Sequence, residues 1–190
     1  MNLAIFASGN GSNFQVLTEK IQAGSISAQL SFLFCDQKEA CALKRAERLS
    51  APHFSFELKE FASKEAYETK LVALLDQHRV DLIVLAGYMK IVGSTLLQAY
   101  KGKIINIHPA FLPEFPGVHG IKDAFKAGVP ESGVTVHYVD SGIDTGKIIQ
   151  QVRVPRLEND TLESFEQRIH QAEYELYPKV VKELVERIRK

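Results

Sequence analysis

Four continuous apolar runs constrain the fold of this chain more than any other feature of its sequence. They are "NLAIFA" at 2–7, "AQLSFLFC" at 28–35, "VDLIVLAG" at 80–87 and "GKIINIH" at 102–108. Each run has the length of a strand and lacks helical periodicity, and strands that are apolar on both faces are typical of a parallel sheet covered by helices. The runs therefore predict a sheet with two buried faces.

Segments with helical spacing lie between these runs. They are 14–24, 38–50 and 63–79, and a short strand-like run, "PHFSFE", lies at 52–57. Ser63 is an N-cap residue at the start of the third segment, and Glu65 adds negative charge near the positive end of that helix. The alternation predicts an α/β fold, a doubly wound, mainly parallel twisted sheet with helices on both faces.

The pattern changes after residue 109. A proline-rich loop leads to a short helix near 120–127, and "GVTVHYVDSGIDTGKIIQQVRV" at 133–154 is typical of two strands joined by a long turn. One long amphipathic helix is expected from about Thr161 to Arg189. The second half of the chain is therefore expected to differ in architecture from the first.

Composition and charge exclude several classes of protein. The chain has 190 residues, no linker or repeat, and 23 basic against 23 acidic side chains, so we expect a single domain at 1–190 that attracts neither nucleic acid nor an anionic membrane. No apolar run approaches the roughly 20 residues that span a bilayer, and the first residues lack the basic lead of a signal peptide. The two cysteines form no CxxC motif. These features predict a cytoplasmic protein.

The segment "SGNGSN" at 8–13 follows the first strand and opens the first helix. Gly9 and Gly11 permit a tight turn with close backbone approach, and free N–H groups at a helix start attract an anion. A dinucleotide fingerprint would require glycine where the chain has Phe14, so a phosphate monoester is favoured over a pyrophosphate. Asp36, after the second strand, keeps a nicotinamide enzyme as an alternative, and a plain strand-to-helix turn explains the loop equally well.

A second group of polar residues lies where the fourth apolar run ends. In an extended strand Asn106 and His108 project to the same side, and Pro109 ends the strand. An imidazole at the carboxyl end of a central strand transfers protons near neutral pH, and an amide donates to a developing oxyanion. Asp144 lies in a turn between two glycines, and close to His108 it would orient the ring and favour its cationic form.

The remaining reactive side chains fit other chemistries poorly. Ser12 lacks the sequence around a serine nucleophile, and Cys35 and Cys41 have no paired histidine. The histidines at 108, 119 and 137 lack the spacing of a metal site, so no metal is expected. Direct transfer of a group, assisted by hydrogen bonds and proton transfer, is the chemistry that these residues favour.

Five motifs in collinear order point to one enzyme family. They are "SGNGSN", "AGYMKIV", "NIHPAFLPEFPG", "GVTVHYVDSGIDTGKII" and "QAEYELYP". Together they resemble the phosphoribosylglycinamide formyltransferases, the folate-dependent enzymes of purine biosynthesis. The resemblance implies a formyltransferase-type Rossmann-like fold and direct transfer of a formyl group from 10-formyltetrahydrofolate to the amine of 5-phosphoribosylglycinamide, without a metal. The expected partners are small-molecule substrates, and the expected assembly is a monomer or weak homodimer.

The resemblance also implies roles for individual residues. Asn106, His108 and Asp144 match the catalytic trio, in which Asn106 and protonated His108 stabilise the tetrahedral oxyanion and His108 relays a proton to the leaving folate nitrogen. The half at about 1–100 would hold the nucleotide phosphate, and the half at about 101–190 the folate and the catalytic residues. The substrate-binding positions are Gly11, Ser12, Asn13, His170, Gln171, Ala172 and Glu173. The folate-binding positions are Lys64, Met89, Lys90, Ile91, Val92, Asn106, Asp140, Ser141, Gly142, Ile143 and Asp144.

Alternatives to this interpretation make different demands on the sequence. Methionyl-tRNA formyltransferase would need a further C-terminal domain and a basic surface, and formyltetrahydrofolate hydrolase a regulatory domain before the catalytic fold. Neither needs a phosphate cradle at 8–13, so that loop favours a nucleotide acceptor. A binding protein without catalysis would not need His108 together with Asp144, and Phe14 disfavours a nicotinamide-dependent reductase.

Overall fold

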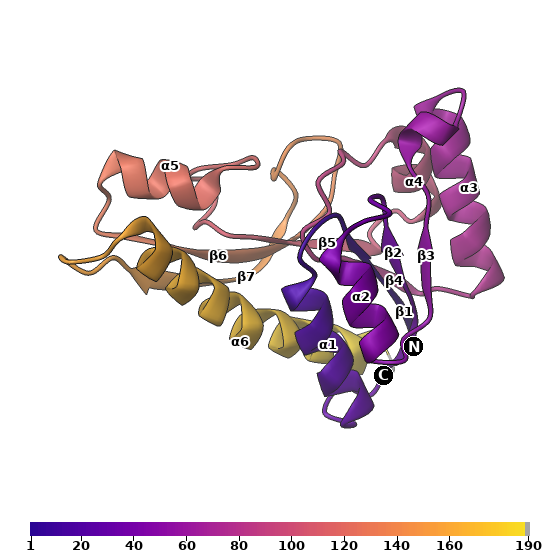
Figure 1. The fold of residues 1–190 in the computed structure, drawn as a ribbon, viewed down its shortest axis with the longest axis horizontal. Helices are drawn as coiled ribbons and strands as arrows, with labels where there is room; N and C mark the ends of the chain where they lie inside the picture. The colour runs from indigo at the N-terminus through magenta and orange to yellow at the C-terminus, as the bar shows by residue number, and fades with distance from the viewer. Residues whose placement is uncertain (189–190) are drawn as a thin grey trace.

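The computed structural model describes residues 1–188, within which a seven-stranded sheet is flanked by helices (Figure 1). The strand order is β3-β2-β1-β4-β5-β6-β7. The strands are β1 (Asn2–Ala7), β2 (Gln29–Cys35), β3 (His53–Ser55), β4 (Leu82–Leu85), β5 (Ile104–His108), β6 (Glu131–Tyr138) and β7 (Ile148–Pro155). The helices are α1 (Ser12–Gln22), α2 (Cys41–Arg48), α3 (Lys64–Gln77), α4 (Ser94–Ala99), α5 (Gly120–Ala127) and α6 (Leu162–Ile188), with a 3-10 turn, η1 (Leu58–Glu60).

The sheet is parallel over most of its width. Strands β3, β2, β1, β4 and β5 run parallel, whereas β6 pairs antiparallel with β5 and β7 pairs antiparallel with β6. The predicted α/β fold with a doubly wound, mainly parallel sheet is confirmed. The two antiparallel strands come from the segment at 133–154, where the sequence predicts two strands and a long turn.

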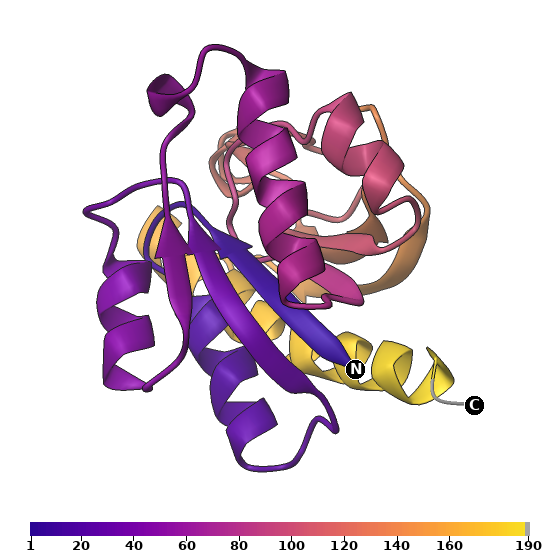
Figure 2. The same cartoon turned by 90° about the vertical axis from the view of Figure 1, so that its right-hand side faces the viewer.

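Strand β1 buries side chains on both of its faces. Leu3 and Ile5 belong to the core shared with α1, α2, α5 and α6, while Ala4 and Phe6 belong to the core shared with α3 and α4. Figures 1 and 2 show α1 and α2 on one side of the parallel strands and α3 on the other. Burial on both faces explains why the strand sequences are apolar without alternation.

Helix boundaries follow sequence signals where the cap is local. Ser63 caps α3 as predicted, its hydroxyl accepting a hydrogen bond from a backbone N–H of the first turn at 3.1 Å. The sequence pattern does not predict α4, whose cap comes from another helix: Glu68 of α3 accepts from the N–H groups of Gly93 at 2.5 Å and Leu96 at 3.2 Å. The predicted long helix is α6, and its predicted end, Arg189, lies outside the described residues.

Helix α6 links neighbouring strands of the parallel sheet. The buried Tyr177 hydroxyl donates to the carbonyl oxygens of Leu85 at 2.7 Å and Ile105 at 3.4 Å, at β4 and β5. Burial raises the pKa of this phenol well above its ordinary value. The same helix packs against α1, α5, β6 and β7, so it contacts elements from both halves of the chain.

The chain changes sides of the sheet between β1 and β4. These two strands are neighbours, yet the connection after β1 leads to α1 on one face and the connection after β4 leads to α4 on the other. Such a switch point opens a crevice at the carboxyl ends of the strands. The fold therefore provides one natural place for a ligand.

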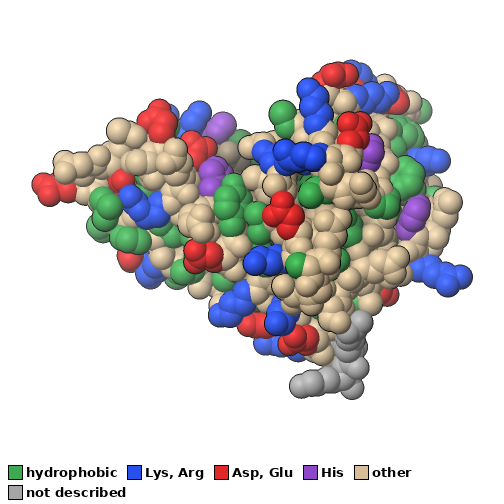
Figure 3. All heavy atoms as spheres, turned by 60° about the horizontal axis from the view of Figure 1, so that its bottom comes forward, with side chains coloured by type: hydrophobic (Ala, Val, Ile, Leu, Met, Phe, Trp, Pro, Cys, Tyr) green, Lys and Arg blue, Asp and Glu red, His purple; other side chains and the backbone are tan. Residues whose placement is uncertain are grey.

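The surface is of mixed charge. On the face that Figure 3 shows, acidic and basic side chains are interspersed, in keeping with the equal numbers of the two in the sequence. Among residues 1–188, no helix is both long enough and apolar enough to cross a membrane.

Candidate active site

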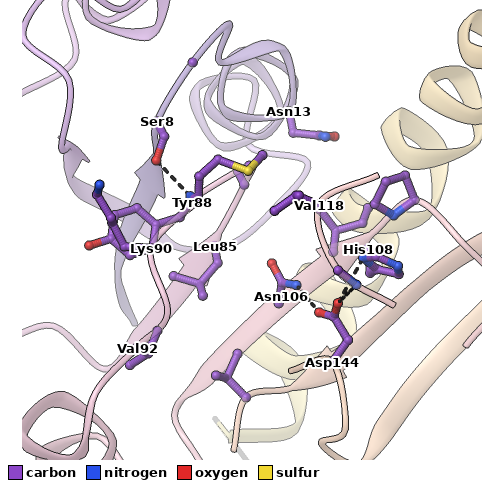
Figure 4. Close-up of a pocket in the computed structure, with 18 of the residues that line it drawn as sticks. Ser8, Asn13, Leu85, Tyr88, Lys90, Val92, Asn106, His108, Val118 and Asp144 are labelled. Atoms are coloured by element: carbon purple, nitrogen blue, oxygen red, sulfur yellow. Dashed lines mark hydrogen bonds and ion pairs between the residues drawn. The ribbon is translucent and has the colours of Figure 1, made fainter. Parts of the chain in front are cut away.

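A cavity of about 410 Å³ opens at the switch point, at the carboxyl ends of β1, β4 and β5. Its walls come from 8–13, 85–92, 106–109, 117–118, parts of 137–144, and two residues of α6. Figure 4 shows Ser8 and Lys90 on one side of it and His108 and Asp144 on the other. This is the position at which open α/β sheets bind their ligands.

The glycine loop after β1 forms one wall of the cavity. Gly11 is the N-cap of α1 with a φ of +75°, and a Cβ there would lie 2.7 Å from the Cα of Ala42, so both conformation and packing require glycine. Because glycine has no side chain to cap the helix, the first N–H groups of α1 are left for another acceptor. Ser12 and Asn13 line the cavity at this helix start, and the arrangement suits a bound anion.

The segment 85–92 after β4 forms a second wall. The Ser8 hydroxyl accepts a hydrogen bond from the Met89 N–H at 2.8 Å, which joins this segment to the glycine loop. Met89 and Ile91 expose 60% and 61% of their surface, far more than apolar side chains in a core. Exposed apolar side chains separated by backbone polar groups suit a flat heteroaromatic ligand.

Asp36 does not line this cavity. Its side chain is buried; Oδ2 accepts from the Gln37 amide at 3.2 Å and lies 3.9 Å from Nζ of Lys90. Within the part of the chain that the structure describes, Oδ1 has no hydrogen-bond partner. A nicotinamide enzyme would use such a carboxylate to bind the ribose, so the position of Asp36 argues against that alternative.

Strand β5 divides its side chains between the core and the cavity. Ile105 and Ile107 pack into the core with α1 and α6, while Asn106 and His108 line the cavity. The structure therefore has the alternation that the sequence predicts for this strand. His108 is only 4% exposed, so its ring is largely removed from solvent.

The carboxylate of Asp144 lies between the imidazoles of His108 and His137, and Figure 4 shows it beside His108 and Asn106. One oxygen is 3.4 Å from Nδ1 of His108 and accepts from the Gly117 N–H at 2.8 Å. The other is 3.4 Å from Nε2 of His137 and 3.5 Å from the amide nitrogen of Asn106. Burial raises the pKa of Asp144, but the contacts with His137, the Gly117 N–H and His108 outweigh it and lower the pKa to about 2. The carboxylate is therefore ionised at neutral pH.

Both ring nitrogens of His108 face oxygen acceptors. Nδ1 faces the Asp144 carboxylate, and Nε2 lies 2.8 Å from the carbonyl oxygen of Phe115. Because neither acceptor has a proton to donate, a ring protonated on both nitrogens satisfies both contacts. Phe115 has a φ of +51°, and a Cβ at Gly120 would lie 3.2 Å from Nε2. The segment 115–120 thus encloses the imidazole.

His137 belongs to this cluster, although it is not among the site residues predicted from the sequence. It is the partner of Asn106 in the β5–β6 register, and its Nε2 lies 3.2 Å from the Asn106 amide nitrogen. Its Nδ1 lies 2.8 Å from the carbonyl oxygen of Tyr138, to which it donates. The sequence does hold a signal: Thr135 and His137 alternate with valines in a buried strand, the pattern that singles out Asn106 and His108 in β5.

Two glycines shape the turn that carries Asp144. A Cβ at Gly142 would lie 2.0 Å from Oγ1 of Thr145, and a Cβ at Gly146 would lie 1.7 Å from a carbonyl oxygen of β6. Oδ1 of Asp140 accepts from the Thr145 hydroxyl at 2.7 Å and from the Gly142 N–H at 3.0 Å. These two hydrogen bonds hold the pKa of Asp140 below its ordinary value. The turn is therefore specified by its own residues.

Helix α6 contributes His170 and Glu173 to the cavity wall. Glu173 is buried, and its carboxylate accepts from Nδ1 of His170 at 2.6 Å. Nε2 of the same ring lies 3.6 Å from the Glu166 carboxylate. The hydrogen bond to Glu173 raises the pKa of His170, against the opposing effect of burial, and Glu166 adds to the rise. The rise favours the protonated form of His170, whose positive charge is paired with these two carboxylates at the cavity wall.

The other predicted binding residues divide into two groups. Those that line the cavity are Met89, Lys90, Ile91, Val92, Asp140, Gly142 and Ile143. Those that do not are Lys64 and Ser141, both exposed; Gln171, which donates to Glu175 at 3.0 Å; and Ala172, which packs against the core. The binding roles of both groups stay predictions. Among the described residues, no group of three or more His, Cys, Asp and Glu side chains is placed to hold a metal ion.

Known proteins resemble this chain over nearly its whole length. Residues 1–181 match the family model described as formyl transferase. Phosphoribosylglycinamide formyltransferase of Bacillus subtilis is 50% identical over 182 residues, which are 96% of this chain and 93% of that protein. The crystal structure of phosphoribosylglycinamide formyltransferase from Streptococcus pneumoniae has 60% identity and a TM-score of 0.92, over 96% of this chain and 98% of that one. Glycinamide ribonucleotide transformylase 1 from Geobacillus kaustophilus has 48% identity and a TM-score of 0.94, over 97% and 98%.

Proposed function

Because this chain belongs to the formyl transferase family, we propose that it transfers the formyl group of 10-formyltetrahydrofolate to the amine of 5-phosphoribosylglycinamide. The products are formylglycinamide ribonucleotide and tetrahydrofolate, and the reaction is a step of de novo purine biosynthesis. One observation carries the proposal: Asn106, His108, His137 and Asp144 converge in the cavity at the switch point.

This cluster suits transfer of a formyl group between two nitrogens. The amine attacks the formyl carbon, a C–N bond forms, and the carbonyl electron pair moves to oxygen. The bond to the folate nitrogen then breaks as that nitrogen receives a proton and the amine loses one. The Asn106 amide donates a hydrogen bond to the oxyanion, and the positive ring of His108, paired with Asp144, stabilises the same charge.

The proton relay predicted for His108 requires a movement. Nε2 lies 2.8 Å from the Phe115 carbonyl and Nδ1 faces Asp144, so neither nitrogen is free to exchange a proton with a substrate in the conformation described. As long as these contacts persist, His108 acts through its charge. We assign stabilisation of the oxyanion as its first role, and relay of the proton as a role that begins when Nε2 leaves Phe115.

The two substrates have separate places in the cavity. The phosphate of the ribonucleotide lies at the start of α1, against Gly11, Ser12 and Asn13, where backbone N–H groups without a side-chain cap can donate hydrogen bonds to an anion. The buried Glu173 carboxylate suits the ribose hydroxyls, and His170 suits the phosphate charge. We assign the pterin of the folate to 88–92 and 140–144, and we assign Lys64, which is exposed and does not line the cavity, to a part of the folate that extends beyond it.

The two free cysteines bear on the cellular compartment in which the enzyme acts. Cys35 and Cys41 are both free, which suits a reducing compartment, and we place the enzyme in the cytoplasm. We further propose that residues 1–190 act as a single domain and as a monomer or weak homodimer, which sedimentation at micromolar protein concentration tests. Neither nucleic acid nor a membrane takes part in the proposed reaction.

The direct test is an assay with and without the acceptor. The protein is incubated with 10-formyltetrahydrofolate and 5-phosphoribosylglycinamide, and the folate product is followed by its absorbance. Product that depends on the acceptor supports the proposal. Product without the acceptor identifies a hydrolase, and no product in either mixture contradicts formyl transfer.

A further inference from the structure

Helix α2 holds the glycine loop from behind. All its residues are described and none of them lines the cavity, yet the Ala42 N–H donates to the carbonyl oxygen of Gly9 at 3.0 Å. Arg45, one turn further along α2, donates from Nε to the carbonyl oxygen of Asn10 at 2.8 Å and from Nη2 to the Asn10 side-chain oxygen at 2.7 Å. The loop therefore lies between α2 and the cavity.

These contacts determine where the N–H groups of the loop point. In a trans peptide unit the carbonyl and the following N–H point in opposite directions, and Leu112-Pro113 is the one cis bond found in residues 1–188. With the carbonyls of Gly9 and Asn10 directed at α2, the N–H groups of Asn10 and Gly11 are directed away from α2. The Arg45 contact thus turns the Gly11 N–H toward the side on which the cavity lies.

The charge of Arg45 is not neutralised by a carboxylate. Its partners are the two Asn10 oxygens and the side-chain oxygen of Gln15, all of them uncharged, and it forms no ion pair with any described residue. A guanidinium keeps its positive charge at every physiological pH. Directly behind a loop at a helix N-terminus, it adds to the positive potential that an anion meets there.

We propose that Arg45 is a positioning residue for the phosphate subsite. It orients the loop at 9–13 and supplies positive charge behind that loop. The inference rests on the proposed function, because it takes the phosphate of the ribonucleotide as the anion at this loop. A residue that merely joined α2 to α1 would affect stability alone. Arg45 in the proposed role affects affinity for a phosphorylated ligand and leaves the folate site unchanged.

Three variants test the inference with ribose 5-phosphate as the probe, and ribose as the control without a phosphate. Arg45→Met removes the hydrogen bonds and the charge, and Arg45→Lys keeps the charge but not the two-pronged contact with Asn10. Arg48→Met is the matched control, since Arg48 lies on the same helix and donates to Gln15 at 2.8 Å without contacting the loop. Binding is measured by calorimetry, and thermal unfolding is measured in parallel.

Arg45→Met is expected to weaken ribose 5-phosphate binding by roughly tenfold or more, in line with the loss of charged hydrogen bonds. The KM for 5-phosphoribosylglycinamide should rise by a similar factor at little change in kcat and in the KM for the folate. The ribose 5-phosphate affinity of Arg45→Lys is expected to lie between those of Arg45→Met and the wild type. If Arg45→Met does not fold, the affinity of Arg45→Lys alone tests the role of Arg45. Arg48→Met should bind like the wild type.

Two results overturn the inference in distinguishable ways. Equal ribose 5-phosphate affinity in wild type and both Arg45 variants removes Arg45 from the subsite. Failure of the wild type to bind ribose 5-phosphate removes the phosphate from this loop. If the proposed function is wrong, the result is a different one: the protein still binds ribose 5-phosphate but does not transfer the formyl group.

Discussion

The two sides of the cavity are built from different kinds of chemical group. The side that follows β1 and β4 presents backbone N–H groups, apolar and small polar side chains, and Lys90 as its charged side chain, and it is held by hydrogen bonds such as that from Met89 to Ser8. The side that follows β5 and β6 presents an amide, two imidazoles and a carboxylate in mutual contact. Backbone groups bind without titrating, whereas side chains of this kind carry charge and protons.

This difference separates binding from chemistry within one cavity. Changes on the side of β1 and β4 should alter KM, because they displace groups that contact the substrates in ground state and transition state alike. Changes on the side of β5 and β6 should alter kcat and its pH dependence. The following variants test that separation, from the largest expected effect to the smallest.

Asp144→Asn should lower kcat by about a thousandfold, because a neutral amide does not stabilise the His108 cation that opposes the oxyanion charge. The KM values should change little, and the pH dependence of kcat should shift. Steady-state kinetics between pH 5 and 9 provide the measurement. Asp76→Asn is the control, since Asp76 accepts a hydrogen bond from the Tyr100 hydroxyl at 3.0 Å and does not line the cavity. A wild-type pH profile in Asp144→Asn would remove Asp144 from the mechanism.

Gly11→Ala should raise the KM for the ribonucleotide by roughly tenfold and lower the free energy of unfolding by about 2 kcal/mol. The added Cβ meets Ala42 at 2.7 Å in a backbone conformation that favours glycine. Gly24→Ala is the control, because Gly24 also has a positive φ of +73° but does not line the cavity, and a Cβ there meets no atom within 4 Å. Equal kinetics in the two variants would contradict the role given to the Gly11 geometry.

His137→Leu should lower kcat by about tenfold, because Asn106 and Asp144 each lose a polar neighbour. The leucine side chain still fills the space of the imidazole, so the fold should be kept. His137→Gln should recover part of the loss, since its amide nitrogen can reach the position of Nε2. Kinetics at saturating substrate measure both variants. An effect on KM alone, without one on kcat, would place His137 outside the catalytic cluster.

His170→Gln should change stability by only a few tenths of a kcal/mol, since the ring is 38% exposed and its ion pair is screened by solvent. The pKa of His170 is raised in the folded state, mainly by Glu173, so its contribution is complete below the ordinary value near 6.5 and is lost as pH rises through the folded pKa. Urea unfolding at pH 6 and pH 9 should show a smaller difference in the variant. A larger difference would reverse the sign of the linkage.

The sequence predicts the fold and the parts of the site that are specified locally. The alternation in β5 places Asn106 and His108 on one face, and the two glycines around Asp144 predict a turn that those glycines indeed shape. Apolar runs without alternation predict a sheet buried on both faces, which is found. Each of these signals lies within a stretch of a few residues, where elementary steric and hydrophobic rules operate.

The features that the sequence does not predict depend on long-range contacts. His137 alternates with valines as Asn106 and His108 alternate with isoleucines, but only the β5–β6 register shows that it lies opposite Asn106. Arg45 has the pattern of a solvated helix charge until the loop at 9–13 folds against it. The acceptor for Nε2 of His108 is a backbone carbonyl, which any residue at position 115 would provide. Helix α4 is missed because Glu68 of another helix supplies its cap.

Helix α6 is synthesised after every strand of the sheet, and this order has a consequence for the nascent chain. Strands β1 to β7 all leave the ribosome before Glu173 and Tyr177 do, and domains generally fold from the amino terminus during synthesis. A nascent chain with the whole sheet exposed still lacks the Glu173 carboxylate in its cavity and the tyrosine that joins β4 to β5. Chains interrupted before this helix would therefore carry the glycine loop and the Asp144 turn but lack the α6 side chains that complete the core on one face of the sheet.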